Sequence, residues 1–187
     1  MLNHHDRVSY GSNNYVESAL FWWLNSDAAA NTQRTPITKF SRAYSYNVAG
    51  FLNGLDASFL ASIDDTVWKC STNNVYECPA SLGGATAGKQ QAYTVTAKIG
   101  LASEMEIFGS YSGTTDGSTV YDLYNGATAD DRKKYRGTSA QAWWLRSPYW
   151  SYASIERDVT SSGGAYSNYA YSSGAVVPAC QISRSAT

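Results

Sequence analysis

The sequence predicts an α+β fold in a single domain, residues 1–187. Three observations lead to this prediction. Helical spacing occurs in the first two thirds of the chain, short strand-like runs dominate after residue 142, and no internal repeat is present. Hydrophobic residues make up 43% of the 187, which is enough for one core at this length. We expect two short helices, an irregular and mostly antiparallel sheet, and long loops.

Residues 11–25, GSNNYVESALFWWLN, are predicted to form the first helix. Asn14 is a favoured capping residue and Glu17 follows three positions later, as in a capping box. Residues 55–63, LDASFLASI, are predicted to form the second helix, with Asp56 as its cap. Its inward side chains are expected to be Phe59, Leu60 and Ile63.

Residues 66–78, TVWKCSTNNVYEC, are typical of a hairpin that turns at Asn73 and Asn74. Such a turn would bring Cys70 and Cys78 close enough for a disulfide in an oxidising setting. Free thiols are the favoured alternative, because the N-terminal run MLNHHDRVSY holds no apolar core of a secretion signal.

The chain from residue 92 to residue 140 combines a strand, a short helix and a long polar stretch. Residues 92–102 are predicted to form the strand. Ser103 and Glu106 make a capping box for a helix that ends at Gly109. Residues 109–140 are polar and glycine-rich, which predicts a loop or an insertion.

The C-terminal part is predicted to hold three strands, at residues 142–147, 156–164 and 174–182. The second of them enters a turn at Gly163 and Gly164. Pro178 cannot donate a backbone hydrogen bond, so the third strand belongs at an edge or a bulge. Trp143 and Trp144 are expected in the core. Arg146 is expected to pair with a buried carboxylate; an exposed arginine is the alternative.

Composition excludes several function classes. A net charge of −1 and only 16% charged residues leave no basic surface for nucleic acid. The longest apolar run, residues 19–24, is too short to cross a membrane. His4 and His5 are adjacent and point to opposite sides of an extended chain, so no metal site is expected, and no cofactor. We expect a protein made without an evident signal peptide.

Residues 149–171 combine five tyrosines and a tryptophan with serine, alanine and glycine, without a clear period of two or 3.6 residues. A tyrosine ring gives a large contact with only two rotatable side-chain angles, and serine, glycine and asparagine add adaptable polar contacts. This composition is typical of a paratope. The apolar runs on both sides, WWLRS and AVVPACQI, are typical of core strands.

Five segments occur in an order that resembles a domain family of phages and gut microbes: YGSNNYVESALFWWLNSD, GFLNGLDASFLASI, KIGLASEMEIFG, WWLRSP and GAVVPACQI. Members of that family often serve as variable proteins of diversity-generating retroelements. The resemblance implies a C-type lectin fold of the branch related to formylglycine-generating enzymes. It also implies a receptor, protein or glycan, on a host or target cell, and a location on a virion or cell surface.

Such retroelements mutate template adenines, so an asparagine codon becomes one of a limited set of residues. Most positions of the predicted variable region, about 149–171, belong to that set. Trp150 and Glu156 do not, so they need another template codon or are fixed. The predicted ligand-binding residues are Tyr149, Trp150, Ser151, Tyr152, Ser154, Ile155, Glu156, Asp158, Tyr166, Ser167, Asn168, Tyr169 and Tyr171.

Two other function classes are weighed against receptor binding. A structural phage or particle component would use the same rings as a permanent contact with phage or particle subunits. An enzyme would need a catalytic group. Glu104 and Glu106 are expected to point to different faces of their helix, and Cys180 has no evident base beside it. No catalytic residue is therefore predicted.

Overall fold

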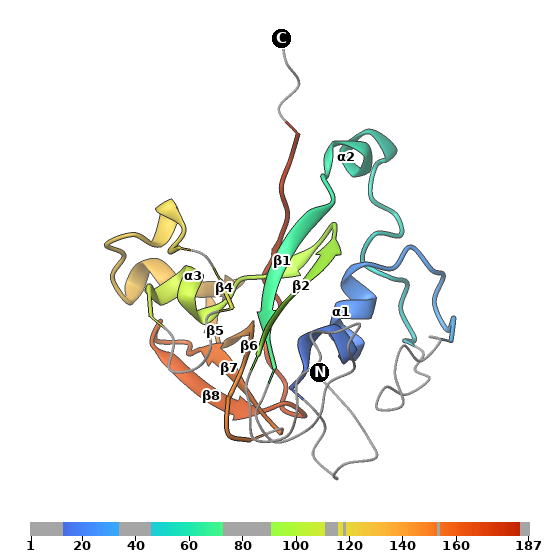
Figure 1. Cartoon of the computed structure of the whole chain (residues 1–187). Coiled ribbons are helices and arrows are strands. Elements are labelled where there is room, and N and C mark those ends of the chain that lie inside the picture. Colours follow the sequence, from blue (N-terminus) through green and yellow to red (C-terminus); the bar gives the residue numbers. More distant parts are fainter. Residues whose placement is uncertain are drawn as a thin grey trace.

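The computed structural model describes residues 13–33, 46–72, 91–110, 116–117, 119–152 and 154–183. Within these ranges short helices and small antiparallel sheets alternate, so the α+β prediction is confirmed. Figure 1 shows the pair β1 and β2 between α1 on one side and α3 on the other, with β6, β7 and β8 at the lower end. The predicted ligand-binding residues lie on and around that lower sheet.

The first predicted helix is interrupted near its start. A single 3-10 turn, Tyr15–Glu17, is followed by α1, Ala19–Leu24. Ser18 has extended backbone angles, and its side chain accepts a hydrogen bond from the backbone N–H of Phe21 at 2.9 Å. The cap is therefore Ser18, and the prediction of Asn14 is wrong. The Asn14 side chain instead donates to Glu17 at 3.0 Å.

The second predicted helix is confirmed as α2, Ala57–Ser62, with Asp56 as its cap. The Asp56 carboxylate accepts from the backbone N–H groups of Ser58 and Phe59 at 2.9 and 3.1 Å. Ile63 is buried as expected, but Phe59 is 43% exposed, so its inward placement was wrong. The reason is that α2 lies at the upper edge of the molecule and buries no residue of its own (Figure 1).

Strand β1, Thr66–Ser71, pairs along its whole length with β2, Ala92–Ala97, in antiparallel register. The described partner of β1 is thus a distant segment, and the sequence did not predict this pairing. The turn at Asn73 and Asn74, like Cys78, lies outside the described residues. Cys70 is a buried free thiol.

The predicted strand at residues 92–102 is divided into β2 and the two-residue strand β3, Gly100–Leu101. Helix α3, Glu104–Phe108, follows with the predicted capping box complete. Ser103 and Glu106 exchange hydrogen bonds of 2.9 and 3.1 Å, and Gly109 ends the helix with φ of 70°. Within the predicted strand at 174–182, the short strand β9, Pro178–Ala179, pairs with β3, and isolated bridges form at Ala175 and Ile182.

The described part of residues 109–140 is more ordered than the predicted loop. It contains 3-10 turns at Asp122–Tyr124 and Asp130–Arg132. It also begins a hairpin of β4, Lys134–Arg136, and β5, Ser139–Gln141, which turns at Gly137 with φ of 61°.

Strands β6, Trp143–Pro148, β7, Ile155–Val159, and β8, Ala165–Tyr169, form a three-stranded antiparallel sheet in that order. Every residue of β6 is buried. Trp144 packs into the apolar cluster around α1 and β1, whereas Trp143 packs into a second cluster around α3. The prediction that both tryptophans lie in the core is confirmed, and β6 lies between two packed layers.

Candidate functional site

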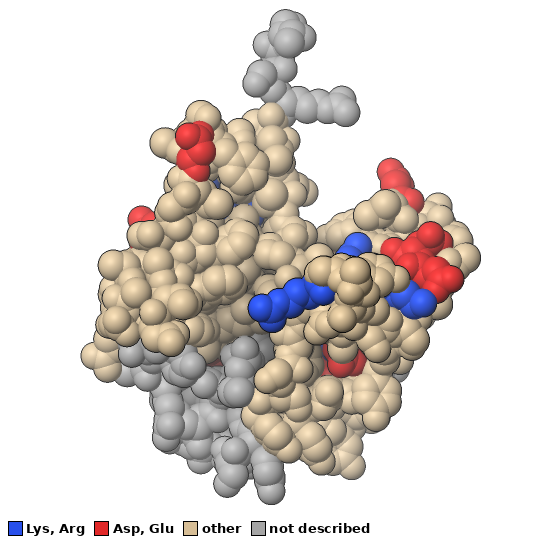
Figure 2. Space-filling model, turned by 180° about the vertical axis from the view of Figure 1, so that it is seen from behind, with Lys and Arg blue, Asp and Glu red and all other residues tan. Residues whose placement is uncertain are grey.

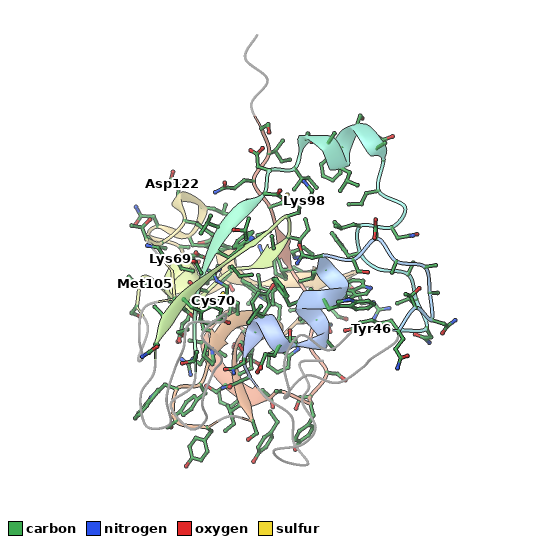
Figure 3. All side chains as sticks on the ribbon, turned by 45° about the vertical axis from the view of Figure 1, so that its right-hand side comes forward. Tyr46, Lys69, Cys70, Lys98, Met105 and Asp122 are labelled. Atoms are coloured by element: carbon green, nitrogen blue, oxygen red, sulfur yellow. The ribbon has the colours of Figure 1, made fainter. Side chains whose placement is uncertain are left out.

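Residues 149–171 place most of their rings on the outside of the molecule. Trp150, Tyr152, Tyr169 and Tyr171 are 40%, 57%, 46% and 40% exposed, and Tyr149 is half-buried beside them. These five residues are called the ring surface below. Figure 3 shows ring side chains projecting from the lower end of the molecule, where β6, β7 and β8 lie.

Two chain segments bring the ring surface together. A turn returns the chain after β6, and in it the Tyr149 and Tyr152 rings lie 5.8 Å apart. At the end of β8, the rings of Tyr169 and Tyr171 stack at 5.1 Å with 13° between their planes. Because Tyr169 lies opposite Ile155 in the sheet, the end of β8 meets the start of β7, and the backbone N–H of Tyr149 donates to Ile155 at 3.1 Å.

Tyr166 is separate from the ring surface although it is 60% exposed. It lies opposite Asp158 in the β7–β8 register, whereas Tyr169 lies opposite Ile155. Successive strand residues point to opposite faces, so Tyr166 and Tyr169, three positions apart, leave the sheet on different sides. The single continuous surface expected from the sequence is thus divided into two parts.

The predicted polar residues are largely engaged within the protein. Ser167 accepts a hydrogen bond from the guanidinium of Arg157. The side-chain oxygen of Asn168 accepts from the backbone N–H of Tyr169 at 2.9 Å and from the hydroxyl of Ser172 at 3.2 Å. Ser151, Ser154 and Ile155 are half-buried. Most of the area open to a ligand therefore belongs to the rings.

Glu156 and Asp158 lie beneath the surface, which corrects their predicted place among the ligand-binding residues. They are 0% and 4% exposed, because their side of β7 faces the core. Both carboxylate oxygens of Glu156 have no hydrogen-bond partner within the described part of the chain. Burial, with the nearby Asp116 carboxylate, raises the pKa of Glu156 well above its usual value. Burial also raises the pKa of Asp158 to about 6.

Asn13 anchors the turn that carries three of the five residues of the ring surface. Its buried side-chain amide donates to the backbone carbonyl oxygens of Tyr149, Tyr152 and Ile155 at 3.1, 2.8 and 2.7 Å. This contact joins the N-terminal segment to residues more than 130 positions away. Asn13 was not predicted as a site residue, because the sequence marks it only by its place in the run GSNNY.

Arg157 connects the ring surface to α3. Its guanidinium forms a two-pronged ion pair with Glu104, with Nε donating at 2.7 Å, and lies 5.9 Å from the centre of the Tyr149 ring. Arg157 was not predicted as a site residue either, because its contact with Glu104 joins positions far apart in the sequence. Such a two-pronged contact fixes the orientation of both side chains.

Arg146 holds the end of β6 through a buried ion pair with Glu106, as predicted. The two guanidinium–carboxylate hydrogen bonds are 2.7 and 2.6 Å long. The same guanidinium also donates to the backbone carbonyls of Lys69, Leu101 and Asp116. Burial lowers the pKa of Arg146, but the hydrogen-bonded Glu106 carboxylate, with further groups such as Asp116 nearby, raises it, and the net shift is upward, so the arginine stays charged.

Several described groups that could carry chemistry are held in structural contacts or buried, whereas Cys180 is a half-buried free thiol. Glu104 and Glu106 point to different partners, as expected from the sequence. Burial raises the pKa of the Cys70 thiol to about 12, and a thiol is a weak nucleophile. Within the described ranges, no three His, Cys, Asp or Glu side chains gather as metal ligands. No helix found there has the length and apolar character needed to cross a membrane.

Comparison with known proteins adds one result about the whole chain. No curated protein and no solved structure matches it. A family described as "Domain of unknown function (DUF6273)" matches residues 2–184, which is nearly the full length. The chain therefore belongs to this family.

Proposed function

We propose that the protein is a variable ligand-binding protein of a diversity-generating retroelement, displayed on a virion or cell surface. The scaffold is a C-type lectin-like domain of the branch related to formylglycine-generating enzymes, and the protein acts without catalysis. Its ligand is a protein or glycan receptor on a host or target cell. The observation that carries the proposal is the ring surface, whose exposed aromatic side chains extend from a sheet held by buried ion pairs.

The ring surface has the physical properties that binding needs. Each tyrosine orders only two side-chain torsions on binding, so the loss of conformational entropy is small for the area gained. The stacking of Tyr169 on Tyr171 orders these side chains further before a ligand arrives. Exposed rings of this kind form the contacts that contribute most to many interfaces.

The identities of the exposed residues support the retroelement part of the proposal. Tyr152, Tyr166, Tyr169 and Tyr171 all belong to the set that mutated asparagine codons produce. Their exposure allows replacement without loss of core packing. The short helices and small antiparallel sheets are compatible with a C-type lectin-like scaffold.

Sequencing the gene from many isolates of one source tests this proposal without knowledge of the ligand. We expect substitutions concentrated in the codons of residues 149–171, and few elsewhere in the chain. A reverse-transcriptase gene should lie nearby, with a near-copy of this segment that differs only at adenines. Substitutions spread evenly along the gene, with no such near-copy, would contradict the proposal.

A second candidate function is a structural phage or particle component whose ring surface is a permanent subunit contact. The exposed rings favour it, because contiguous apolar surface commonly marks protein–protein contacts. The mass of the purified protein in solution separates the two candidates. A stable assembly that shields the ring tyrosines from iodination supports the structural component, and a monomer with reactive ring tyrosines supports receptor binding.

A further inference from the structure

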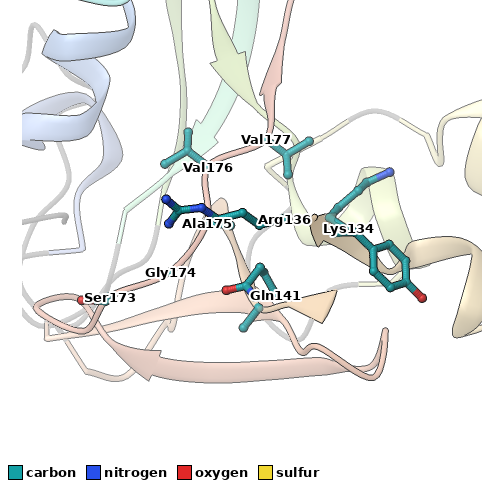
Figure 4. Close-up of a pocket in the computed structure, with 10 residues that line it drawn as sticks. Lys134, Arg136, Gln141, Ser173, Gly174, Ala175, Val176 and Val177 are labelled. Atoms are coloured by element: carbon teal, nitrogen blue, oxygen red, sulfur yellow. The ribbon is translucent and has the colours of Figure 1, made fainter. Parts of the chain in front are cut away.

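A pocket of about 480 Å³ lies outside the predicted variable region. One wall comes from the β4–β5 hairpin, with residues 134–136 and 141–142, and the other from residues 173–177. Figure 4 shows these two segments facing each other across the pocket. The volume is within the range of sites that hold small molecules.

Arg136 supplies an unpaired positive charge to this pocket. It is exposed, and it has no hydrogen-bond or ion-pair partner among the residues that the structure describes. Figure 4 shows its guanidinium extended between Val176 and Gln141. The ammonium group of Lys134, by contrast, is held over the rings of Tyr124 and Trp143 at 5.4 and 5.9 Å.

The charge that surrounds the pocket is local. Figure 2, which views the molecule from behind relative to Figure 1, shows basic and acidic side chains close together on one part of the surface and mostly uncharged surface elsewhere. An anion would therefore be recognised by an individual cation and not by a broad positive field. A guanidinium matches the two oxygens of a carboxylate through parallel hydrogen bonds.

The remaining lining combines an aliphatic floor with a polar rim. Ala175, Val176 and Val177 contribute the floor, and the hydrogen bonds of Ala175 to Ala142 and Trp144, 2.8 and 3.1 Å long, fix its position. The polar rim consists of Tyr135, Gln141 and Ser173. The Gln141 amide nitrogen already donates to the chain, which leaves its carbonyl oxygen to accept from a ligand hydroxyl.

We propose that this pocket binds an acidic sugar, a carboxylate-bearing monosaccharide unit, with Arg136 holding the carboxylate. The separate hydroxyl and amide groups of the rim match the several hydroxyls of a sugar ring, and the aliphatic floor matches its C–H face. None of the lining residues belongs to residues 149–171. The site is thus a fixed one beside the ring surface, and it does not depend on the proposed retroelement function.

Titration of the full-length, nitrogen-15-labelled protein with glucuronate at pH 7 tests the proposal, with glucose as the neutral control. We expect glucuronate to shift the amide signals of Arg136, Gln141, Gly174 and Ala175, and glucose to bind at least 10-fold more weakly. Arg136→Gln should weaken glucuronate binding at least 10-fold. Lys133→Gln removes the same charge from the neighbouring surface, where Lys133 pairs with Asp130, and should leave affinity unchanged.

Ser173→Glu is a second test that keeps Arg136 in place. The new carboxylate on the exposed rim would compete for the guanidinium, so glucuronate binding should fall, with the rest of the amide spectrum preserved as evidence of folding. The proposal is overturned if the protein binds glucuronate and glucose with equal affinity. It is also overturned if Arg136→Gln binds glucuronate as tightly as the unaltered protein does. Acetate binding as tightly as glucuronate overturns the sugar assignment. A Tyr152→Ala variant should bind glucuronate normally, so this test fails or succeeds separately from that of the ring surface.

Discussion

Residues 143–148 and residues 149–152 adjoin at one peptide bond and have opposite surroundings. Every residue of β6 is buried between two packed layers, whereas Trp150 and Tyr152 are exposed. The first segment is held through Arg146 by groups from four other parts of the chain. The change is abrupt because the side chains of β6 pack into the core, whereas Trp150 and Tyr152 extend into water although Asn13 still holds the backbone of their turn.

Arg146→Met is expected to have the largest effect on the stability of the buried framework around β6. This change leaves the Glu106 carboxylate buried without its partner, which costs about 3–5 kcal/mol of the free energy of unfolding. Urea unfolding measures the effect. The matched control is Arg136→Met, where the exposed arginine has no partner in the described ranges, and it should lie within about 0.5 kcal/mol of the unaltered protein. Equal losses of unfolding free energy in the two variants would contradict the distinction between the buried framework and the exposed surface.

Glu156→Gln tests the buried side of β7 by pH. The folded protein keeps the Glu156 proton to a higher pH than the unfolded chain, which releases it near 4.5. The free energy of unfolding therefore falls as pH rises above 4.5, and the glutamine variant lacks this loss. Urea unfolding from pH 4 to pH 8 should show the variant gaining stability relative to the unaltered protein.

Asp116 and Asp158 are present in both proteins of this pH comparison, the unaltered protein and Glu156→Gln. Burial raises the pKa of each to about 6, so each also lowers stability as pH rises from about 4 to 6 in both proteins. Their contribution largely cancels in the difference. A difference that does not vary with pH would show that the Glu156 carboxyl is not held protonated by the fold.

Asn13→Ala tests the hydrogen bonds that join the N-terminal segment to the turn of the ring surface. Loss of the three amide contacts should cost about 1–2 kcal/mol, and amide hydrogen exchange at residues 149–155 should accelerate more than in β1 and β2. Asn53→Ala is the control, since that exposed amide makes one contact, to Asp27. If residues 149–155 exchange at the normal rate in the Asn13 variant, the anchoring role is wrong.

Tyr152→Ala is expected to have the smallest effect on stability, within about 0.5 kcal/mol, because the ring is mostly in water. Tyr15→Ala, at a fully buried ring that packs edge-on against Phe21, should cost about 3–5 kcal/mol. Thermal unfolding compares the two variants. A large loss from Tyr152→Ala would mean that the ring surface belongs to the core, against the proposed function.

Local signals in the sequence predicted local structure well. The capping box of α3, the cap of α2 and the glycine that ends α3 each depend on residues within four positions of one another, and all three are confirmed. The pairing of β1 with β2 was missed because strand pairing depends on residues far apart in the sequence. The same reason explains why Asn13 and Arg157 were missed.

The candidate site was predicted in part. Tyr-rich composition located the exposed rings, since a ring-rich stretch without regular apolar spacing does not form a core strand. Composition did not separate Glu156 and Asp158 from the rings, because charged residues are usually exposed, whereas these two lie on the side of β7 that faces the core. Register in the sheet, which the sequence does not reveal, also decides that Tyr166 lies on the other face.

The hydrogen bonds from Asn13 to the turn after β6 also affect which substitutions the turn tolerates. Its three acceptors are main-chain oxygens, and all twenty amino acids carry that oxygen. These hydrogen bonds therefore do not depend on which side chains occupy positions 149, 152 and 155. The side chains at these positions can be replaced while the backbone of the turn keeps its hydrogen bonds to Asn13.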